Sequence, residues 1–297
     1  MKAKLFLLTA LFFAAPLFPA RSQTIYVSSF SVNTIDKFDS AGNGSVFATA
    51  SSGLSDPDGL ALDKNGDLFV ANFGSNIEEF SPSGSGSVFA ATSGVFTGLA
   101  FDNQGNLYAS DGSQILKFDS MGNESVFVST NLPFQDYGFD AGLAFGPDGD
   151  LFASFYDGSI LKFNSNGVST VFASGVLNPQ GLAFDASGNL YVASTSRQIL
   201  KFSPTGQESI FASNFAGAFP LGLGFDSSGN LYATRHTGSF GQDQIMKFNP
   251  AGVGTVFASH LDNAIDIAIE NIPEPSSPML TMLGVLVLCA IRKRRTR

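Results

Sequence analysis

One phrase recurs along the chain and limits what it can fold into. A glycine followed by Leu-Ala-Phe-Asp, or by a close variant, opens five copies that lie 39 to 44 residues apart, at Gly59, Gly98, Gly142, Gly181 and Gly222. Each copy contains four short apolar runs separated by Gly, Asn, Asp and Ser, which is typical of four antiparallel strands. Four strands in about 40 residues is the size of one propeller blade.

Counting the strand types predicts six blades. The third strand of the repeat ends in phenylalanine six times, at Phe38, Phe80, Phe118, Phe163, Phe202 and Phe248. The first strand has only five glycine copies, but residues 264–269 match it at the right interval, and the chain enters the repeat with a second strand at residues 25–27. We therefore predict an all-β fold, a six-bladed β-propeller of four-stranded antiparallel blades, closed by pairing of the C-terminal strand with the N-terminal strands. Such closure removes exposed sheet edges.

The phenylalanine content fits this fold. Of the 31 phenylalanines, 12 occupy two fixed positions of the repeat. We interpret them as core residues packed between neighbouring sheets, because burial of a phenylalanine stabilises a fold by about 1.5–3 kcal/mol. An aromatic binding stripe is the alternative reading.

The first 22 residues have the pattern of a secretory signal peptide. Lys2 and Lys4 precede an apolar run over residues 5–15, and small residues at Ala20 and Ser22 predict cleavage by signal peptidase before Gln23. The run is short for a bilayer span. An uncleaved N-terminal anchor is the alternative.

The last 26 residues have the pattern of a sorting signal. Pro273, Glu274 and Pro275 precede an apolar stretch at 279–291 and the basic end at 292–297. This order resembles the PEP-CTERM sorting tail of Gram-negative bacteria. The resemblance implies transient membrane association through a transmembrane helix, recognition by an exosortase-type sorting enzyme, and release to the cell surface or an exopolysaccharide matrix. A simple membrane anchor is the alternative. We thus expect a signal peptide at 1–22, a propeller at 23–271 and a sorting tail at 272–297.

Charge and cysteine content exclude several functions. Eight of the 16 basic residues but only one of the 25 acidic residues lie in the two end segments, so residues 23–271 carry 24 acidic against eight basic side chains. Nucleic acid is not expected as a partner, because phosphate binding needs clustered Lys and Arg. The single cysteine, Cys289, lies in the tail. A disulfide or a cysteine-ligated metal in the propeller is therefore excluded.

The polar turns of the repeat look superficially like calcium loops. Segments such as 63–67, 102–106, 185–189 and 226–230 begin with Asp and have Gly in fourth place. They lack the alternating ligands and closing Glu of an EF-hand. Asp first and a left-handed Gly later is what a tight turn prefers, so we predict turns, with cation binding as the alternative.

Antiparallel order predicts where a ligand would bind. Connections between second and third strands, and between blades, share one face, and the long irregular segments 129–141, 213–221 and 235–244 all fall there. Variable loops on a rigid scaffold commonly carry binding residues. The predicted ligand-binding residues are Phe134, Asp136, Tyr137, Asp140, Arg235, His236 and Asp243.

The repeat resembles NHL-type and regucalcin/gluconolactonase-like propellers, most fully at residues 179–185 and 188–193. Lactonases of that group hold a divalent metal at the channel mouth through Glu, Asn and Asp side chains. Here Gln180 stands where an Asn would be expected, and no Glu marks an inner-strand start. Asp58, Asp140 and Asp266 do lie near such starts. We therefore expect no cofactor, with a divalent cation bound by these three carboxylates as the alternative.

Catalytic patterns are sparse. His236 and His260 are the only histidines, which excludes a multi-histidine metal centre, and no nucleophile-elbow motif leads from a strand into a helix. The leading hypothesis is a non-enzymatic surface or extracellular-matrix module that binds polysaccharide or protein. The alternatives are a metal-dependent lactonase or lyase of the gluconolactonase-like group, and a purely structural matrix protein.

Overall fold

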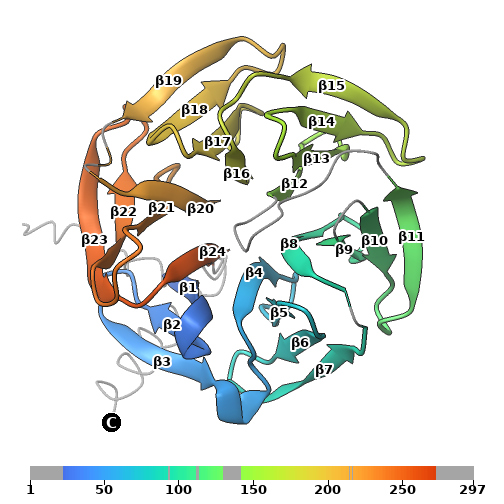
Figure 1. Cartoon of the computed structure of the whole chain (residues 1–297), viewed down its shortest axis with the longest axis vertical. Coiled ribbons are helices and arrows are strands. Elements are labelled where there is room, and N and C mark those ends of the chain that lie inside the picture. The colour runs from blue at the N-terminus through green and yellow to red at the C-terminus, as the bar shows by residue number, and fades with distance from the viewer. Residues whose placement is uncertain are drawn as a thin grey trace, which may run out of the picture. The chain divides into compact units, whose positions relative to one another are not determined.

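The structure, a computed structural model, describes residues 23–92, 94–111, 114–129, 142–213, 215 and 217–271. The predicted signal peptide and sorting tail lie outside these ranges. The described residues form six four-stranded antiparallel sheets arranged in a ring (Figure 1). The predicted six-bladed β-propeller is confirmed. In the described ranges the helices are the 3-10 turns η1 (Phe30–Val32) and η2 (Ala50–Ser52), and no helix is long and apolar enough to cross a membrane.

Each blade has four strands, numbered outward from the central axis. The first strands are β4 (Pro57–Leu62), β8 (Phe96–Phe101), β12 (Leu143–Phe145), β16 (Pro179–Phe184), β20 (Phe219–Phe225) and β24 (Ala264–Asn271). The second strands are β1 (Gln23–Ser29), β5 (Leu68–Asn72), β9 (Leu107–Asp111), β13 (Leu151–Ser154), β17 (Leu190–Ser194) and β21 (Leu231–His236). The third strands are β2 (Thr34–Phe38), β6 (Ile77–Phe80), β10 (Gln114–Phe118), β14 (Ile160–Phe163), β18 (Gln198–Phe202) and β22 (Asp243–Phe248). The fourth strands are β3 (Gly44–Thr49), β7 (Gly86–Ala90), β11 (Glu124–Ser129), β15 (Ser169–Ala173), β19 (Glu208–Ser213) and β23 (Gly254–Leu261).

Blade 1 closes the ring. Its strand order is β24-β1-β2-β3, so the last strand of the propeller lies beside the first (Figure 1). The register pairs Ile25 with Ile269 and Val27 with Ile267, which confirms the predicted closure. Gln23 pairs with Asn271. The two ends of the ring therefore meet at one point.

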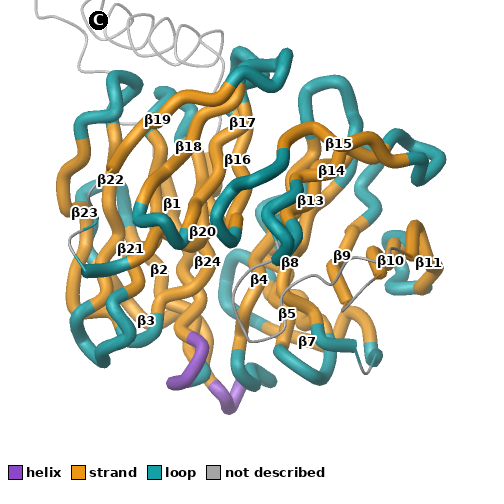
Figure 2. Tube along the Cα trace, turned by 45° about the horizontal axis from the view of Figure 1, so that its top comes forward, coloured by secondary structure: helices purple, strands orange, loops and turns teal. Residues whose placement is uncertain are grey.

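The strands run between two faces of the ring (Figure 2). We call one the turn face, because it carries the turns from first to second and from third to fourth strands. The other, the loop face, carries the connections from second to third strands and from blade to blade, including η1 and η2. Gln23 begins a second strand and Asn271 ends a first strand. Both ends of the ring therefore lie at the turn face.

The turns of the turn face share one hydrogen-bonded form, seen at residues 185–189. The Asp185 N–H donates to the Asn189 carbonyl, and Gly188, with φ +79°, donates to the Asp185 carbonyl. The Asp185 carboxylate accepts from the N–H groups of Ser187 and Asn189, each at 2.9 Å. Burial alone would raise the pKa of Asp185, but hydrogen bonds from Asn189 and Ser187 and the nearby Lys201 ammonium together lower it. The predicted turn is confirmed, because the Asp185 carboxylate accepts hydrogen bonds from backbone N–H groups of the same turn.

Aromatic rings hold neighbouring blades together. Five of the six fourth-strand phenylalanines meet the third-strand phenylalanine of the next blade edge to face, with ring centroids 6.0–6.5 Å apart. The pairs are Phe47–Phe80, Phe89–Phe118, Phe127–Phe163, Phe172–Phe202 and Phe211–Phe248. At the junction of blades 6 and 1, Phe257 packs against the cluster that contains Phe38. The phenylalanines are thus core residues, as predicted.

Candidate functional site

The waist of the central channel is built from the repeat glycines. A Cβ added to Gly59, Gly142 or Gly181 would lie 2.4 Å from a backbone carbonyl oxygen of the next blade. Such a distance excludes any side chain there, so glycine lets the inner strands approach closely. In blade 1 the same repeat position carries Asp266. The waist therefore has one side chain where the other blades have none.

Hydroxyl groups join the inner strands around this waist. Ser154 accepts from the Gly142 N–H at 2.8 Å and donates to the Gln180 carbonyl of the next blade at 2.9 Å. Thr234 does the same between Gly222 and Ile265, at 2.9 and 2.6 Å. Both hydroxyls belong to fully buried residues. They satisfy backbone groups that would otherwise be costly to bury.

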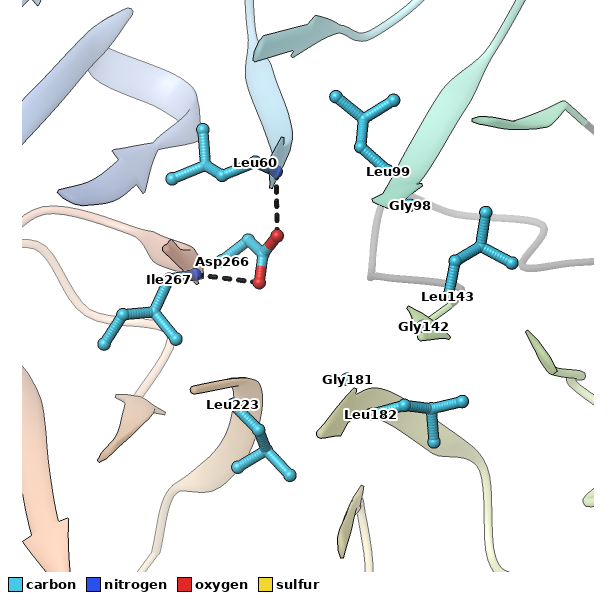
Figure 3. A pocket seen from close by; sticks show the side chains of 10 residues that line it. All are labelled: Leu60, Gly98, Leu99, Gly142, Leu143, Gly181, Leu182, Leu223, Asp266 and Ile267. Carbon is cyan, nitrogen blue, oxygen red and sulfur yellow. Dashed lines mark hydrogen bonds between the residues drawn. The ribbon is translucent and has the colours of Figure 1, made fainter. Parts of the chain in front are cut away.

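Asp266 is held by backbone groups on both sides (Figure 3). Its Oδ2 accepts from the Leu60 N–H of blade 2 at 2.8 Å, and its Oδ1 accepts from the Ile267 N–H at 2.8 Å. Its own N–H donates to Ser28 Oγ of β1 at 2.9 Å. The carboxylate therefore connects the closing strand to blade 2 as well as lining the channel.

The channel cavity is small and is bounded mainly by backbone groups and Asp266, because the surrounding leucine and Ile267 side chains are buried and point away from it (Figure 3). It has a volume of about 130 Å³ and is lined by Leu60, Gly98, Leu99, Gly142, Leu143, Gly181, Leu182, Leu223, Asp266 and Ile267 (Figure 3). Asp58 is fully buried and does not line it. In the described ranges no group of three His, Cys, Asp or Glu side chains could hold a metal ion. Asp140, the third carboxylate of the predicted cation site, lies outside the described residues, so that site stays a prediction.

His236 and Asp243 come together on the loop face. His236 Nδ1 lies 2.9 Å from Asp243 Oδ2, and both side chains are buried, Asp243 completely. Asp243 also accepts from the N–H and the hydroxyl of Thr237 at 2.7 and 2.8 Å and from the Ala264 N–H at 2.9 Å. Burial would raise the pKa of Asp243, but the hydrogen bonds from His236 and Thr237 outweigh it and hold this pKa below its usual value. The carboxylate therefore fixes the imidazole.

A hollow of about 210 Å³ lies beside this pair. We call it the Phe240 hollow, and it is lined by Ser31, His236, Gly238, Ser239, Phe240 and Asn263. Phe240 is 69% exposed. Of these lining residues, His236 was predicted from the sequence, whereas Ser31, Phe240 and Asn263 were not. One feature of the sequence could have identified Phe240 as a non-core residue. It lies in a long irregular connection and outside the two fixed phenylalanine positions of the repeat.

Arg235 lies apart from the hollow. Successive residues of a strand point to opposite sides, and Arg235 lines a different groove, of about 400 Å³, with Phe215, Gln244 and Met246. Its guanidinium donates to Gln244 Oε1 at 3.2 Å and to the Phe215 carbonyl at 3.1 Å. The structure thus brings His236 and Asp243 together but separates Arg235 from them.

Several predicted residues lie outside the described ranges. These are Phe134, Asp136, Tyr137 and Asp140 of the connection before blade 4, and Pro273, Glu274 and Pro275 of the sorting motif. The apolar segment 279–291 lies outside them too. Their roles stay predictions.

No protein-family model and no curated protein matches the chain. Solved structures do match its fold. A gluconolactonase from Xanthomonas campestris is 19% identical with a TM-score of 0.58, over 71% of this chain and 78% of that one. A calcium-binding regucalcin from Agrobacterium tumefaciens is 15% identical with a TM-score of 0.57, over 71% and 76%. A catalytically inactive histidine-to-alanine variant of virginiamycin B lyase from Staphylococcus aureus, with quinupristin, is 16% identical with a TM-score of 0.58, over 72% and 74%. The chain therefore shares its fold with regucalcin/gluconolactonase-like six-bladed propellers, some of which are enzymes.

Proposed function

We propose that this chain is an exported, non-enzymatic β-propeller that binds polysaccharide or protein at the cell surface or in the extracellular matrix. The observation that carries the proposal is the Phe240 hollow on the loop face, where an exposed aromatic ring lies beside the buried His236 and the hydrogen-bonded pair Ser31 and Asn263. The channel is the weaker candidate for a ligand site, because its cavity of about 130 Å³ offers little room for a metabolite. Rigid scaffolds commonly carry binding residues on such loops.

The position of the chain ends supports display of the loop face. The predicted signal-peptidase site precedes Gln23, and the predicted exosortase-type motif at 273–275 follows Asn271. These two residues pair at the turn face. Both proposed cleavage sites are next to residues at the turn face, so the opposite loop face would be accessible to a ligand. The test is the intact mass of the protein collected from the surface of a Gram-negative host. We expect an N-terminus at Gln23 and loss of the basic end, whereas retention of both ends would contradict export by this route.

Binding is tested with exopolysaccharide purified from the bacterium that encodes the chain. The full chain, in a detergent without a sugar headgroup, should co-sediment with the polysaccharide in a saturable way. A scaffold role alone predicts no saturable binding to either polysaccharide or purified surface proteins. That outcome would favour the purely structural alternative.

A metal-dependent lactonase or lyase is the second candidate. Two observations favour it: the fold is shared with a gluconolactonase and a lyase, and His236 with its buried Asp243 partner has the form of a general base. Calorimetry with Ca²⁺ and Zn²⁺, followed by a lactone-hydrolysis screen, separates the two candidates. Stoichiometric metal binding, with turnover lost in Asp140→Ala or His236→Ala, would replace the binding-module proposal.

A further inference from the structure

The walls of the Phe240 hollow come from three distant parts of the chain. Ser31 lies in η1 after β1. His236 ends β21, and Gly238 to Phe240 lie between β21 and β22. Asn263 immediately precedes β24. Asn263 Nδ2 donates to Ser31 Oγ at 2.7 Å across 232 residues of sequence. The hollow therefore exists only when β24 has closed the ring.

The polar wall of the hollow is fixed before any ligand arrives. Asn263 has a left-handed backbone, with φ +51°, and its carbonyl accepts from the Phe30 N–H at 3.2 Å. The imidazole of His236 is held by Asp243, which in turn receives three further hydrogen bonds. Polar groups held in this way lose little conformational entropy when they bind a ligand.

The aromatic wall is open to solvent. Phe240 is flanked by the small residues Ser239 and Gly241 in the sequence, and it stays 69% exposed. The Gly241 N–H donates to Asp262 Oδ1 at 2.6 Å, which anchors the connection that carries the ring. A large exposed aromatic side chain on an anchored segment, beside fixed polar groups, is a common arrangement for recognition.

The chemistry of the lining selects the class of ligand. A hydroxyl from Ser31, an amide from Asn263 and an imidazole from His236 offer hydrogen bonds, while no lining residue carries a carboxylate or an ammonium. The ligand should therefore be uncharged, rich in hydroxyls on one side and apolar on the other. A pyranose ring has these properties, because its C–H face can lie on an aromatic ring while its hydroxyls reach polar groups.

We propose that the Phe240 hollow binds one neutral sugar ring of a polysaccharide, stacked on Phe240 and hydrogen-bonded by Ser31, His236 and Asn263. This inference rests on the proposed function and names its ligand class. At about 210 Å³, the hollow is smaller than the roughly 300–1,000 Å³ of drug-sized ligand sites. It fits one ring, so affinity for a free monosaccharide should be weak and should rise with repetition along a polymer.

The experiment measures binding of the full chain to neutral tetrasaccharides of glucose, galactose and mannose by calorimetry, with an alginate tetrasaccharide as the charged comparison. Two variants test the hollow. Phe240→Ala removes the exposed ring, and Asn263→Gly removes the amide while keeping a residue suited to the left-handed backbone. Tyr156→Ala is the matched control, because Tyr156 is also an exposed aromatic residue, 55% exposed, on the loop face of blade 4.

Each outcome decides the inference. Binding of a neutral tetrasaccharide that weakens at least tenfold in Phe240→Ala and Asn263→Gly, but less than twofold in Tyr156→Ala, supports it. Equal affinity in wild type and both hollow variants, with their melting curves unchanged, overturns the assignment of the hollow while the proposed function stands. Binding of only the charged sugar, or of only a purified surface protein, also overturns it and leaves the binding module intact. If the wild-type chain binds none of these sugars, the inference fails, and the proposed function fails with it only if the chain also binds neither the purified exopolysaccharide nor a surface protein.

Discussion

Asp266 Oδ2 accepts a hydrogen bond from the Leu60 N–H at 2.8 Å across 206 residues of sequence. Blade 1 thus differs from the other blades at the waist, where a carboxylate replaces the repeat glycine and reaches the inner strand of blade 2 (Figure 3). The contact ties the last strand of the ring to the first complete blade.

Replacement of Asp266 by Asn should destabilise the ring. An amide can accept with one atom only, so one of the two backbone N–H donors, from Leu60 or Ile267, loses its acceptor. We expect a loss of about 1–3 kcal/mol in the free energy of unfolding, measured by chemical denaturation. The control is Asp39→Asn, because Asn164 and Asn249 already begin equivalent turns. A loss below about 0.5 kcal/mol for Asp266→Asn, equal to that of the control, would show that the closure does not depend on this carboxylate.

Gly181→Ala should destabilise far more than Gly224→Ala. A Cβ at Gly181 would lie 2.4 Å from the Leu221 carbonyl oxygen, whereas one at Gly224 first meets the Ile269 side chain, at 3.1 Å. The other blades carry alanine where blade 6 has Gly224, so this change restores the repeat. Backbone shifts from overpacking cost about 1–3 kcal/mol or more. Thermal melts of the two variants make the comparison, and similar melting temperatures would contradict the close approach at the waist.

Glu79→Lys should stabilise blade 2. Five blades have lysine at this position, and four of these lysines lie within 4 Å of a turn aspartate. They are Lys117, Lys162, Lys201 and Lys247. In blade 2, burial and the neighbouring Asp67 and Asp63 raise the pKa of Glu79, which shows that its charge is unfavourable. We expect a gain of roughly 0.5–1 kcal/mol. This corresponds to a rise in melting temperature of about 1–4 °C for a chain of this size.

A second variant separates the two causes of that gain. Glu79→Gln removes the repulsion but adds no ion pair, so it should stabilise less than Glu79→Lys. High salt should reduce the difference between them, because partly exposed charges are screened. A lysine variant that melts below wild type would contradict this view of the repeat.

Glu78→Gln should stabilise the protein at pH 7 but not at pH 4. Glu78 is 3% exposed, and burial raises its pKa despite the hydrogen bond from Asn76 Nδ2 at 2.8 Å. A raised folded pKa means that the carboxylate costs stability at neutral pH, and that the wild type recovers this stability as pH falls through the raised value. We expect an advantage for the variant on the order of 1 kcal/mol at pH 7. Denaturation at both pH values tests this, and an equal advantage at pH 4 would exclude the buried charge as its cause.

Asp243→Asn should show the opposite pH dependence. The pKa of Asp243 is lowered in the folded state, so its contribution is fully present above the unfolded pKa of about 3.9 and is lost as pH falls through the lowered value. The variant should lose roughly 1–3 kcal/mol at pH 7, and the gap to wild type should narrow below about pH 4. A difference in unfolding free energy between wild type and variant that stays constant from pH 7 to pH 3 would show that packing, and not the charge of Asp243, holds His236 in place.

The sequence repeat alone was enough to predict the number of blades and the closure of the ring. Each blade must bury the same apolar positions against its neighbours, so the copies reveal the strand count, and the misplaced sixth copy at residues 264–269 reveals the closure. The pairing of Ile25 with Ile269 follows that prediction. The same logic identified the phenylalanines as core and the aspartate turns as turns, because both patterns depend on local periodicity.

The loop face depended on tertiary structure. Ser31, His236 and Asn263 lie far apart in sequence and belong to no repeated pattern, so nothing in their spacing shows that they surround one hollow. Successive side chains of a strand point to opposite sides, which separated Arg235 from its neighbour His236. Ring closure brought Asp266 next to Leu60. A repeat encodes which faces must be buried, and this can be read along the chain. Which irregular side chains meet is decided only when the ends join and distant loops share one surface.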